Sequence, residues 1–264
     1  MAIHIRPTVR RRMSHAASYV VFLAIVVVMA FTADWKLVSR NFFNFTVAQE
    51  LWPGIILATL NTIWYTVACF VIGTVLAVVF ALMKMSRGPF KWFAIGFIEL
   101  FRGMPALLTI MIMAFAVPMA FKGLRIPPEP VGNGLVGLIL VTIAYTAELI
   151  RAGIQAVPKG QREAAQSLGM GELRTTLSVI LPQAIRIVIP PLTNEFVMLL
   201  KDTSLLYIAG ATMYSKELTL FAKDGLSTYA NATPFIVAGV FYLIITIPLT
   251  YMVGILEKRM AVKK

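Results

Sequence analysis

The sequence is poor in the residue types that most often carry chemistry. Its 264 residues contain a single cysteine, Cys69, and two histidines, His4 and His15, both before the first long apolar run. A disulfide framework and a multi-cysteine metal site are therefore excluded. No HExxH, GxSxG or paired-carboxylate motif occurs in the apolar segments, so we expect no catalytic residue, no metal site and no enzymatic activity. Cys69 lies inside an apolar run and is interpreted as a small buried residue.

A phosphate-binding loop of the Walker A type is also missing. That loop ends in a Gly-Lys dipeptide, and no glycine of this chain is followed by a lysine. The chain cannot hold nucleotide phosphates in that way, and we expect it to carry no cofactor of its own. If it does work driven by ATP, the energy has to arrive from a partner that binds the ATP and Mg²⁺.

Acidic residues are scarce as well, and apolar residues are abundant. Twelve Asp and Glu stand against 24 Lys and Arg, which gives a net charge of +12, and 59% of the residues are hydrophobic. The mean hydropathy of +0.81 is too high for a soluble domain of this size, so the bilayer is the expected solvent. The sequence therefore predicts an all-α membrane protein.

Six segments are long enough to cross a bilayer, which takes about 20 residues. The first is read as a retained helix rather than a signal peptide, because its apolar run is long and no small-x-small cleavage site follows. The last but one differs from the others because Pro190, Pro191, Glu195, Lys201 and Asp202 interrupt it. The six segments are Ala16–Ala33, Leu51–Met83, Gly103–Phe121, Pro130–Ala147, about Gln183–Ile208, and Gly225–Leu256.

The basic residues are best explained as topology signals. With the N-terminus inside, the cytoplasmic segments hold 16 Lys and Arg and the opposite side holds six, a bias that follows the positive-inside rule. We therefore predict that both termini are cytoplasmic, that the protein contacts membrane lipid, and that it binds no nucleic acid.

One polar cytoplasmic segment, residues 158–182, lies between two of the apolar runs. Pro158 and Gly160 should end the preceding helix, and Glu163 should lie in the first turn of the next one, where its charge suits the helix dipole. Gly169 and Gly171 should end that helix, and a second helix, Glu172–Ile180, should stop at Pro182. Ala164, Ala165 and Leu168 are grouped by their spacing. This small apolar face could seat in a groove on another protein, or the segment could be a solvated connector.

A family resemblance favours the first reading. Glu163-Ala164-Ala165, three residues, Gly169, nine residues and Val179-Ile180-Leu181-Pro182 resemble the EAA loop of ABC-importer permeases, with Val179 where isoleucine is usual. The stretch Leu100–Pro105 resembles the FRGTP stretch of the polar amino acid branch, with Met104 in place of threonine. Further short tags resemble that branch. They are Tyr145–Glu148, Ile150–Ile154, Pro182–Arg186 and Lys201–Leu205.

The resemblance implies a five-helix type I permease core over residues 50–258, with its coupling loop at 158–182. Residues 1–49 would be a basic tail, an extra transmembrane helix and an outer loop, and 259–264 a basic C-terminal tail. Glu163, Ala164, Ala165, Leu168 and Gly169 would couple to a cytoplasmic ATPase dimer. A second permease subunit, identical or related, and an extracytoplasmic substrate-binding protein would complete the complex in the bacterial plasma (inner) membrane. The chain would move a polar amino acid, such as glutamate, glutamine or a basic one, by alternating access.

The interrupted segment carries the substrate hypothesis. Pro190 and Pro191 lack N–H groups, so we expect the helix to be kinked and broken there. Glu195 would lie about 18 Å from Gln183, near the bilayer midplane, where a carboxylate normally marks a pathway. Asn194 and Lys201 share one face of the helix, and Glu195 and Asp202 the next. Lys201 could bind a substrate carboxylate, and Glu195 or Asp202 its ammonium. For Lys201 and Asp202, an interfacial structural role is an equal alternative.

Other polar residues in the apolar runs are weaker candidates. Asn61 and Thr62 could line a path, but such residues often only bond across helices. Glu99 with Arg102, and Glu148 with Arg151, have the spacing of local ion pairs that anchor helix ends.

A second class of protein fits part of the pattern. An ion-coupled secondary transporter also needs intramembrane charge and a broken helix, but it typically has internal repeats. We find one interrupted span and no second copy, so this reading is the alternative.

Overall fold

The computed structural model describes residues 7–260, and among these the side chains from Ala17 onward. The first six residues and residues 261–264 of the basic C-terminal tail lie outside the described part, so the cytoplasmic placement of the termini stays a prediction. Every regular element in the described part is helical. The chain divides into two compact units after Phe45.

The first unit contains α1 (Pro7–Thr32) and α2 (Trp35–Phe42). The uncharged run Ala16–Ala33 falls almost entirely within α1, as the sequence predicts. Asp34 ends the run and caps the next helix, because its carboxylate accepts a hydrogen bond from the Leu37 N–H at 3.0 Å. The short helix α3 (Phe45–Glu50) begins at the boundary between the units.

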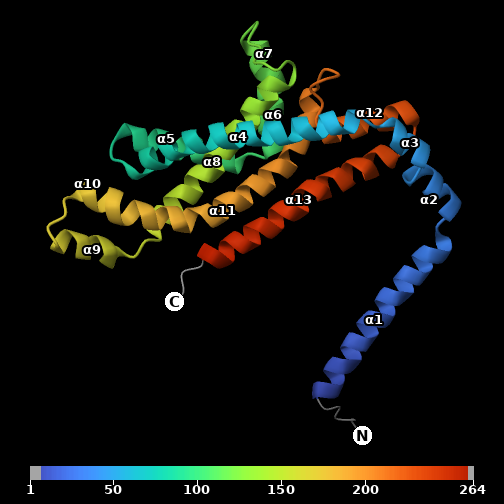
Figure 1. Ribbon diagram of the computed structural model, residues 1–264, viewed down its shortest axis with the longest axis horizontal. Helices are drawn as coiled ribbons and strands as arrows, with labels where there is room; N and C mark the ends of the chain where they lie inside the picture. The colour runs from blue at the N-terminus through green and yellow to red at the C-terminus, as the bar shows by residue number, and fades with distance from the viewer. Residues whose placement is uncertain (1–6, 261–264) are drawn as a thin grey trace. The chain divides into compact units, whose positions relative to one another are not determined.

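The second unit is a bundle built around α4 (Gly54–Met85) and α8 (Val131–Gln155). The helix α11 (Leu181–Asp202) packs on α8, and α13 (Thr233–Met260) packs on α11 (Figure 1). Shorter elements lie at its two ends: α9 (Lys159–Ser167) and α10 (Glu172–Thr175) at one, and α12 (Leu218–Tyr229) at the other. The 3₁₀ segment η3 (Thr203–Ala209) follows α11.

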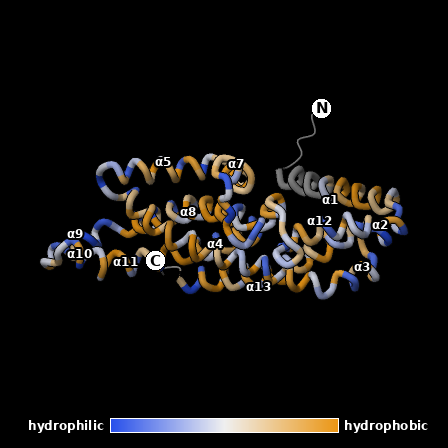
Figure 2. The backbone as a smooth tube through the Cα atoms, turned by 90° about the horizontal axis from the view of Figure 1, so that it is seen from above, coloured by the Kyte–Doolittle hydropathy of each residue, from blue (hydrophilic) through white to orange (hydrophobic). Residues whose placement is uncertain are grey.

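Apolar residues cover the long helices, while α9 and α10 are mostly polar (Figure 2). Within the described part, four helical stretches are long and apolar enough to cross a membrane, or up to six if each of two bent pairs is one span. The four are Gly54–Met85, Val131–Gln155, Glu172–Ala209 and Thr233–Met260. This arrangement confirms an all-α membrane protein, and the predicted six spans are the upper count.

Two predicted helices are interrupted in the structure. The expected span Gly103–Phe121 is wrong at its start, because α5 (Pro89–Gly103) is a helix of its own and the chain bends by 106° before α6 (Ala106–Met111). A residue before proline avoids helical backbone angles, and Met104, which precedes Pro105, is extended with ψ 141°. After α6 the chain continues as a π-turn η1 (Ile112–Ala116) and α7 (Val117–Ala120).

The expected last span, Gly225–Leu256, is divided between α12 and α13. Ala230 adopts the left-handed conformation, with φ 47°, and ends α12. The Asn231 side chain then accepts a hydrogen bond from the Thr233 N–H at 2.8 Å and starts α13. A polar turn thus separates two helices within one uncharged run, because hydropathy does not report backbone conformation.

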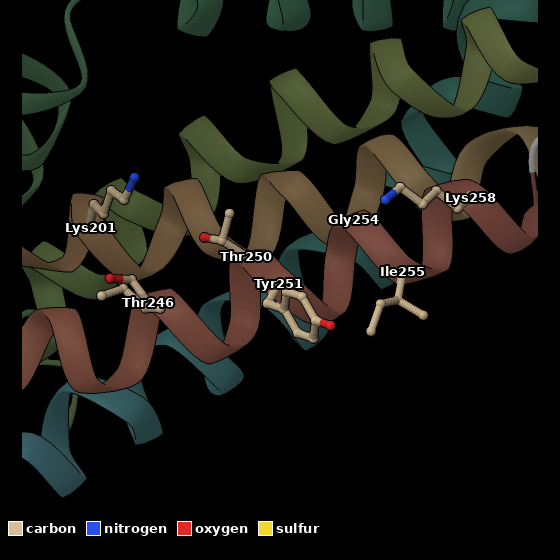
Figure 3. Close-up of a pocket in the computed structure, with 8 residues that line it drawn as sticks. Lys201, Thr246, Thr250, Tyr251, Gly254, Ile255 and Lys258 are labelled. Carbon is tan, nitrogen blue, oxygen red and sulfur yellow. The ribbon is translucent and has the colours of Figure 1, made fainter.

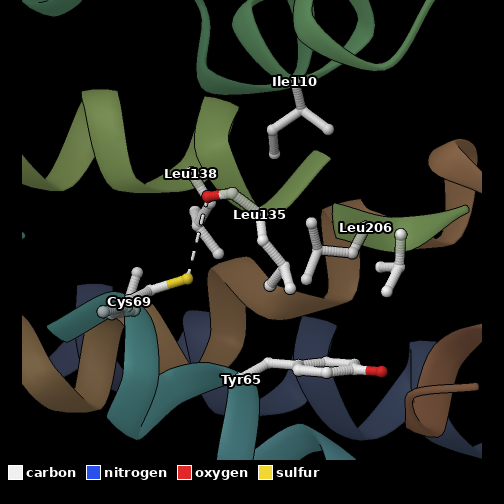
Figure 4. Packing of buried hydrophobic residues seen from close by; sticks show 8 residues of the cluster. Tyr65, Cys69, Ile110, Leu135, Leu138 and Leu206 are labelled. Atoms are coloured by element: carbon white, nitrogen blue, oxygen red, sulfur yellow. Dashed lines mark hydrogen bonds between the residues drawn. The ribbon is translucent and has the colours of Figure 1, made fainter. Parts of the chain in front are cut away.

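The core of the bundle surrounds Cys69, as the sequence predicts for a small buried residue. Its side chain is fully buried, and its thiol donates to the carbonyl oxygen of Leu135 on α8 over 3.8 Å. Tyr65, Leu138 and Leu206 pack around it (Figure 4). The core therefore joins α4, α8 and the chain that follows α11.

Close packing of α6 and α8 depends on Gly137. A Cβ atom at this position would lie 2.8 Å from the Ile110 Cα and 3.2 Å from its backbone nitrogen. Backbone atoms cannot rotate away, so we expect Gly137→Ala to cost about 1–3 kcal/mol of stability, the usual range for overpacking. The measurement is the melting temperature of the purified protein in detergent. Gly239→Ala is the matched control, because Gly239 of α13 has no atom within 4 Å of that position. An unchanged melting temperature for Gly137→Ala would contradict this packing.

Candidate functional site

The polar segment between α8 and α11 forms a helical hairpin with a defined cap. The Met170 N–H bonds to the Ala165 carbonyl at 3.2 Å, and the Gly169 N–H to the Gln166 carbonyl at 2.9 Å. These two bonds form a Schellman motif, and Gly169 occupies its left-handed position with φ 79°. The glycine therefore ends α9, as predicted. Nothing lies within 4 Å of a Cβ built there, so the backbone conformation alone requires glycine.

The hairpin presents two large apolar side chains to the outside of the chain. Leu168 is 84% exposed and Leu173 is 74% exposed. Ion pairing and hydrogen bonding hold the hairpin beneath them, because Glu172 pairs with Arg162 and also accepts from Gln166 at 2.6 Å. An apolar tip on a polar support is typical of a surface that another protein covers.

Three predictions about this segment are wrong in detail. Glu163 is the fifth residue of α9 rather than part of its first turn, because the helix already starts at Lys159, after Pro158. Ala165 is buried, whereas Ala164 and Leu168 are exposed, so the three do not form one exposed apolar face. Gly160 lies inside α9 and does not break a helix.

The second helix does not stop at Pro182. A π-turn, η2 (Thr176–Ile180), leads from α10 directly into α11. The Leu181 N–H bonds to the Thr176 carbonyl, five residues back. Proline has no N–H to donate to a helical hydrogen bond. The hydrogen-bond pattern changes from i→i−5 to i→i−4 just before Pro182, so Pro182 lies in the first turn of α11, where a proline is tolerated. The second helix of the hairpin, α10, therefore continues through η2 into α11 and the bundle without a break.

The predicted break at Pro190 and Pro191 is also absent. The helix α11 runs through both residues to Asp202. Each proline removes one helical hydrogen bond, but packing on α8 and α13 holds the helical conformation, as neighbouring helices commonly do in membrane proteins.

Ion pairs join the ends of α4, α5 and α8. The Lys84 ammonium lies 3.0 Å from Glu148 and 3.4 Å from Glu99, and Arg151 pairs with Glu148. The prediction of a local Glu148–Arg151 pair is thus confirmed. The predicted pair of Glu99 with Arg102 is wrong, because the Arg102 guanidinium lies over the Tyr145 ring of α8, 5.7 Å from its centre.

The structure does not bring all six predicted substrate residues to one place. Asn194 and Lys201 are exposed, and Glu195 and Asp202 are partly buried, on α11. A cavity of about 480 Å³ lies between α11 and α13, and Lys201 is the α11 residue that lines it (Figure 3). A lysine on this face of α11 is thus placed to meet an anion.

Asn61 and Thr62 of α4 hold the segment that precedes α12. The Asn61 side chain donates to the carbonyls of Tyr214 and Lys216, at 2.8 and 3.0 Å. The Thr62 hydroxyl accepts from the Leu218 N–H at 3.1 Å. Both side chains therefore position a connecting segment.

A buried acid in the same region was not identified from the sequence. Glu217 is 1% exposed, and its carboxylate accepts from the N–H groups of Thr219 and Leu220, both at 2.6 Å. The Tyr242 hydroxyl of α13 donates to it at 3.3 Å. Glu217 is thus the N-cap of α12 and joins that helix to α13. The only sequence signal is an acid just before an apolar helix, which is weak because glutamate is not a preferred N-cap.

Stability should depend on pH through Glu217. Burial raises the pKa of its carboxyl to about 7, although the backbone N–H donors of Thr219 and Leu220 act in the opposite direction. The folded state then binds a proton more tightly than the unfolded state, so this contribution to stability is fully present below about pH 4.5, falls as the pH rises to about 7, and is constant above. We expect a loss on the order of 3 kcal/mol at most.

The measurement compares melting temperatures between pH 5 and 8. Glu217→Gln should reduce the fall in melting temperature with rising pH. Glu129→Gln should show the same fall as the wild type, since the Glu129 side chain is 50% exposed. Equal slopes for the wild type and Glu217→Gln would contradict the assignment.

Comparison with known proteins identifies related chains. The family model described as "binding-protein-dependent transport system inner membrane component" matches residues 70–262. A probable glutamine ABC transporter permease of Bacillus subtilis (strain 168) is 38% identical over 226 residues, which cover 84% of this chain and 97% of the relative. An L-cystine transport system permease of the same organism is 35% identical, with 81% and 89% covered. A crystal structure of an amino acid ABC transporter with histidines has a TM-score of 0.74 at 34% identity, and the match covers 82% of this chain and 98% of that one.

Proposed function

This chain belongs to the binding-protein-dependent transport system inner membrane components, and on that premise we propose that it moves a polar amino acid into the cytoplasm. It is the permease subunit of an ATP-driven ABC importer in the plasma (inner) membrane. The observation that carries the proposal is the hairpin of α9 and α10, where Leu168 is 84% exposed on a chain without a Walker A loop. The hairpin is suited to receive work from a separate ATPase.

The partners follow from this role. A cytoplasmic ATPase dimer would cover Glu163, Ala164, Leu168 and Gly169, with buried Ala165 supporting that surface from below. A second permease, identical or related, would complete the path, and an extracytoplasmic binding protein would deliver the substrate. ATP and Mg²⁺ would be bound by the ATPase, and this chain would remain a translocation subunit. Residues 50–258 would form the transport domain, with 1–49 and 259–264 as additions.

We further propose that α11 carries the substrate contacts. Lys201 would bind the substrate carboxylate, and Glu195 or Asp202 its ammonium, with Asn194 on the lysine face. Charged groups inside a membrane protein are costly and commonly mark a pathway. Asn61 and Thr62 would contribute by holding the segment before α12, which their hydrogen bonds reach.

The test is reconstitution of the complete complex in proteoliposomes. Uptake of a labelled amino acid should require internal ATP and the binding protein. Uptake driven by an ion gradient without ATP would instead favour a secondary transporter and contradict the proposal.

A second measurement addresses Glu195. We expect Glu195→Gln to lower the uptake rate or change the substrate preference, because the neutral amide no longer attracts an ammonium group. Thr193→Val is the matched control on the same helix, since the Thr193 hydroxyl already donates to the Ile189 carbonyl at 2.7 Å. Wild-type kinetics in Glu195→Gln would remove this residue from the site.

A further inference from the structure

The cavity between α11 and α13 is the starting point. Its volume of about 480 Å³ falls within the range of small-molecule sites. Lys201 contributes from α11, and the other lining residues share one face of α13. They are Thr246, Ile247, Thr250, Tyr251, Gly254, Ile255 and Lys258.

The charged groups of this cavity are all positive. Lys201 and Lys258 lie at its two ends (Figure 3), and no acidic side chain lines it. Neither ammonium forms an ion pair with a carboxylate among the residues that the structure describes. Both lysine side chains are exposed on this chain, and two ammonium groups in one cavity without a carboxylate partner favour an anionic ligand.

Two hydroxyl groups lie in the otherwise largely apolar wall between the lysines. Thr246 and Thr250 present hydroxyls one turn apart on α13. The Thr246 hydroxyl donates to the Tyr242 carbonyl at 2.8 Å and still offers lone pairs. A Cβ atom at Gly254 would meet nothing within 4 Å, so the glycine leaves room in the cavity rather than closing a helix contact.

The two lysines are separated along the helix axis. Thr246 and Lys258 are twelve residues apart on α13, which corresponds to about 18 Å. Lys201 of α11 lies beside Thr246, which is near the middle of α13. Lys258 is in the last turn of α13. The cavity thus connects the middle of the helix with the end that the positive-inside pattern places in the cytoplasm.

We propose that this cavity is the inner part of the substrate path and that its two lysines restrict the importer to amino acids of zero or negative net charge. This rests on the proposed function. The α-ammonium common to all amino acids is left to Glu195 or Asp202, which lie on the neighbouring face of α11. The substrate's carboxylate, amide or acidic side chain meets Lys201 and then Lys258. A cationic side chain is repelled by both lysines, because no acidic side chain in the lining offsets their charge.

The experiment measures amino acid binding to the purified permease–ATPase complex without the binding protein, so that the delivery protein does not set the selectivity. Equilibrium dialysis in nanodiscs of phosphatidylcholine would use labelled glutamate, glutamine and arginine. We expect glutamate and glutamine to bind at least about tenfold more tightly than arginine, a ratio that corresponds to ~1.4 kcal/mol.

Three variants test the assignment. Lys201→Glu and Lys258→Glu should each lower the affinity for glutamate and glutamine relative to that for arginine. Gly254→Leu should weaken binding of all three while the melting temperature stays unchanged, because the new side chain fills the cavity without a clash. Lys122→Glu, on an exposed loop, makes the same charge change elsewhere and should leave the ratio unaltered.

Several results would overturn the inference. Arginine binding as tight as glutamate, no binding by the wild-type complex, or a ratio unchanged by both lysine variants would each do so. The phosphate of a lipid headgroup is another anion that could bind to Lys201 and Lys258. If adding phosphatidylglycerol to the nanodiscs stabilises the wild type but not Lys201→Glu, and no amino acid binds, the cavity belongs to lipid. The proposed function itself fails only if ATP-driven amino acid uptake is absent.

Discussion

Gly169→Val should abolish coupling, so that the complex hydrolyses ATP but imports at least about tenfold less substrate per ATP, while the protein still inserts. Gly169 has φ 79° and open space around it, so the valine meets no neighbour. Its cost is backbone strain, on the order of 1–2 kcal/mol for an ordinary residue and more for a β-branched one. The chain escapes that strain by opening the Schellman bonds to Ala165 and Gln166, which displaces the exposed Leu168.

Two controls separate conformation from bulk and from general strain. Gly169→Asn should retain most of the coupling, since asparagine tolerates the left-handed conformation. Gly123→Val imposes similar strain at φ 86°, also with open space around it, but in another loop. The readout is the ratio of substrate imported to ATP hydrolysed in proteoliposomes. A wild-type ratio in Gly169→Val would show that the hairpin does not transmit the work.

The sequence predicts the turn of this hairpin well because the signals for a turn are local, although it misplaces the start of α9 and the end of the second helix. A left-handed glycine, a preceding proline and a polar stretch between apolar runs each act within a few residues. The end of α9 at Gly169 could therefore be located from the pattern alone. The resemblance to EAA loops supplied the role, which spacing by itself left open between a docking surface and a connector.

Helix continuity was predicted less well, because it depends on neighbouring helices. The three prolines at 182, 190 and 191 predict a stop and a break, yet all three lie within α11, which follows η2 directly. Conversely, the uncharged runs at 103–121 and 225–256 read as single spans and contain a bend at Met104 and a left-handed residue at Ala230. Hydropathy reports the solvent of a segment and not its backbone conformation.

The candidate site shows the same limit. Seven-residue spacing correctly groups residues by helix face, but it does not show which helix that face meets. The placement of Lys201 beside the face of α13 that lines the cavity and the burial of Glu217 against Tyr242 depend on residues far apart in the sequence. No single segment encodes them, so they became visible only in the folded bundle.

The second large effect is expected at Glu148, whose carboxylate bonds to both Lys84 and Arg151. The side chains of Glu148, Lys84 and Arg151 are 20%, 15% and 24% exposed. Glu148→Gln leaves both cations without this partner. Removing one member of a fully buried pair costs about 3–5 kcal/mol. Because this cluster is partly exposed, we expect about 2 kcal/mol, or a melting temperature lower by roughly 4–8 °C.

Glu99→Gln is the control within the same cluster. Its side chain is 62% exposed and lies 3.4 Å from Lys84, so its removal should cost less than about 1 kcal/mol. The double variant Glu148→Gln with Lys84→Met then identifies the cause. If an unpaired ammonium is what destabilises Glu148→Gln, replacing that ammonium with an apolar side chain should recover part of the loss. Equal losses for Glu148→Gln and Glu99→Gln, or no recovery in the double variant, would show that these charges do not anchor α8, the helix that leads into the hairpin, to α4.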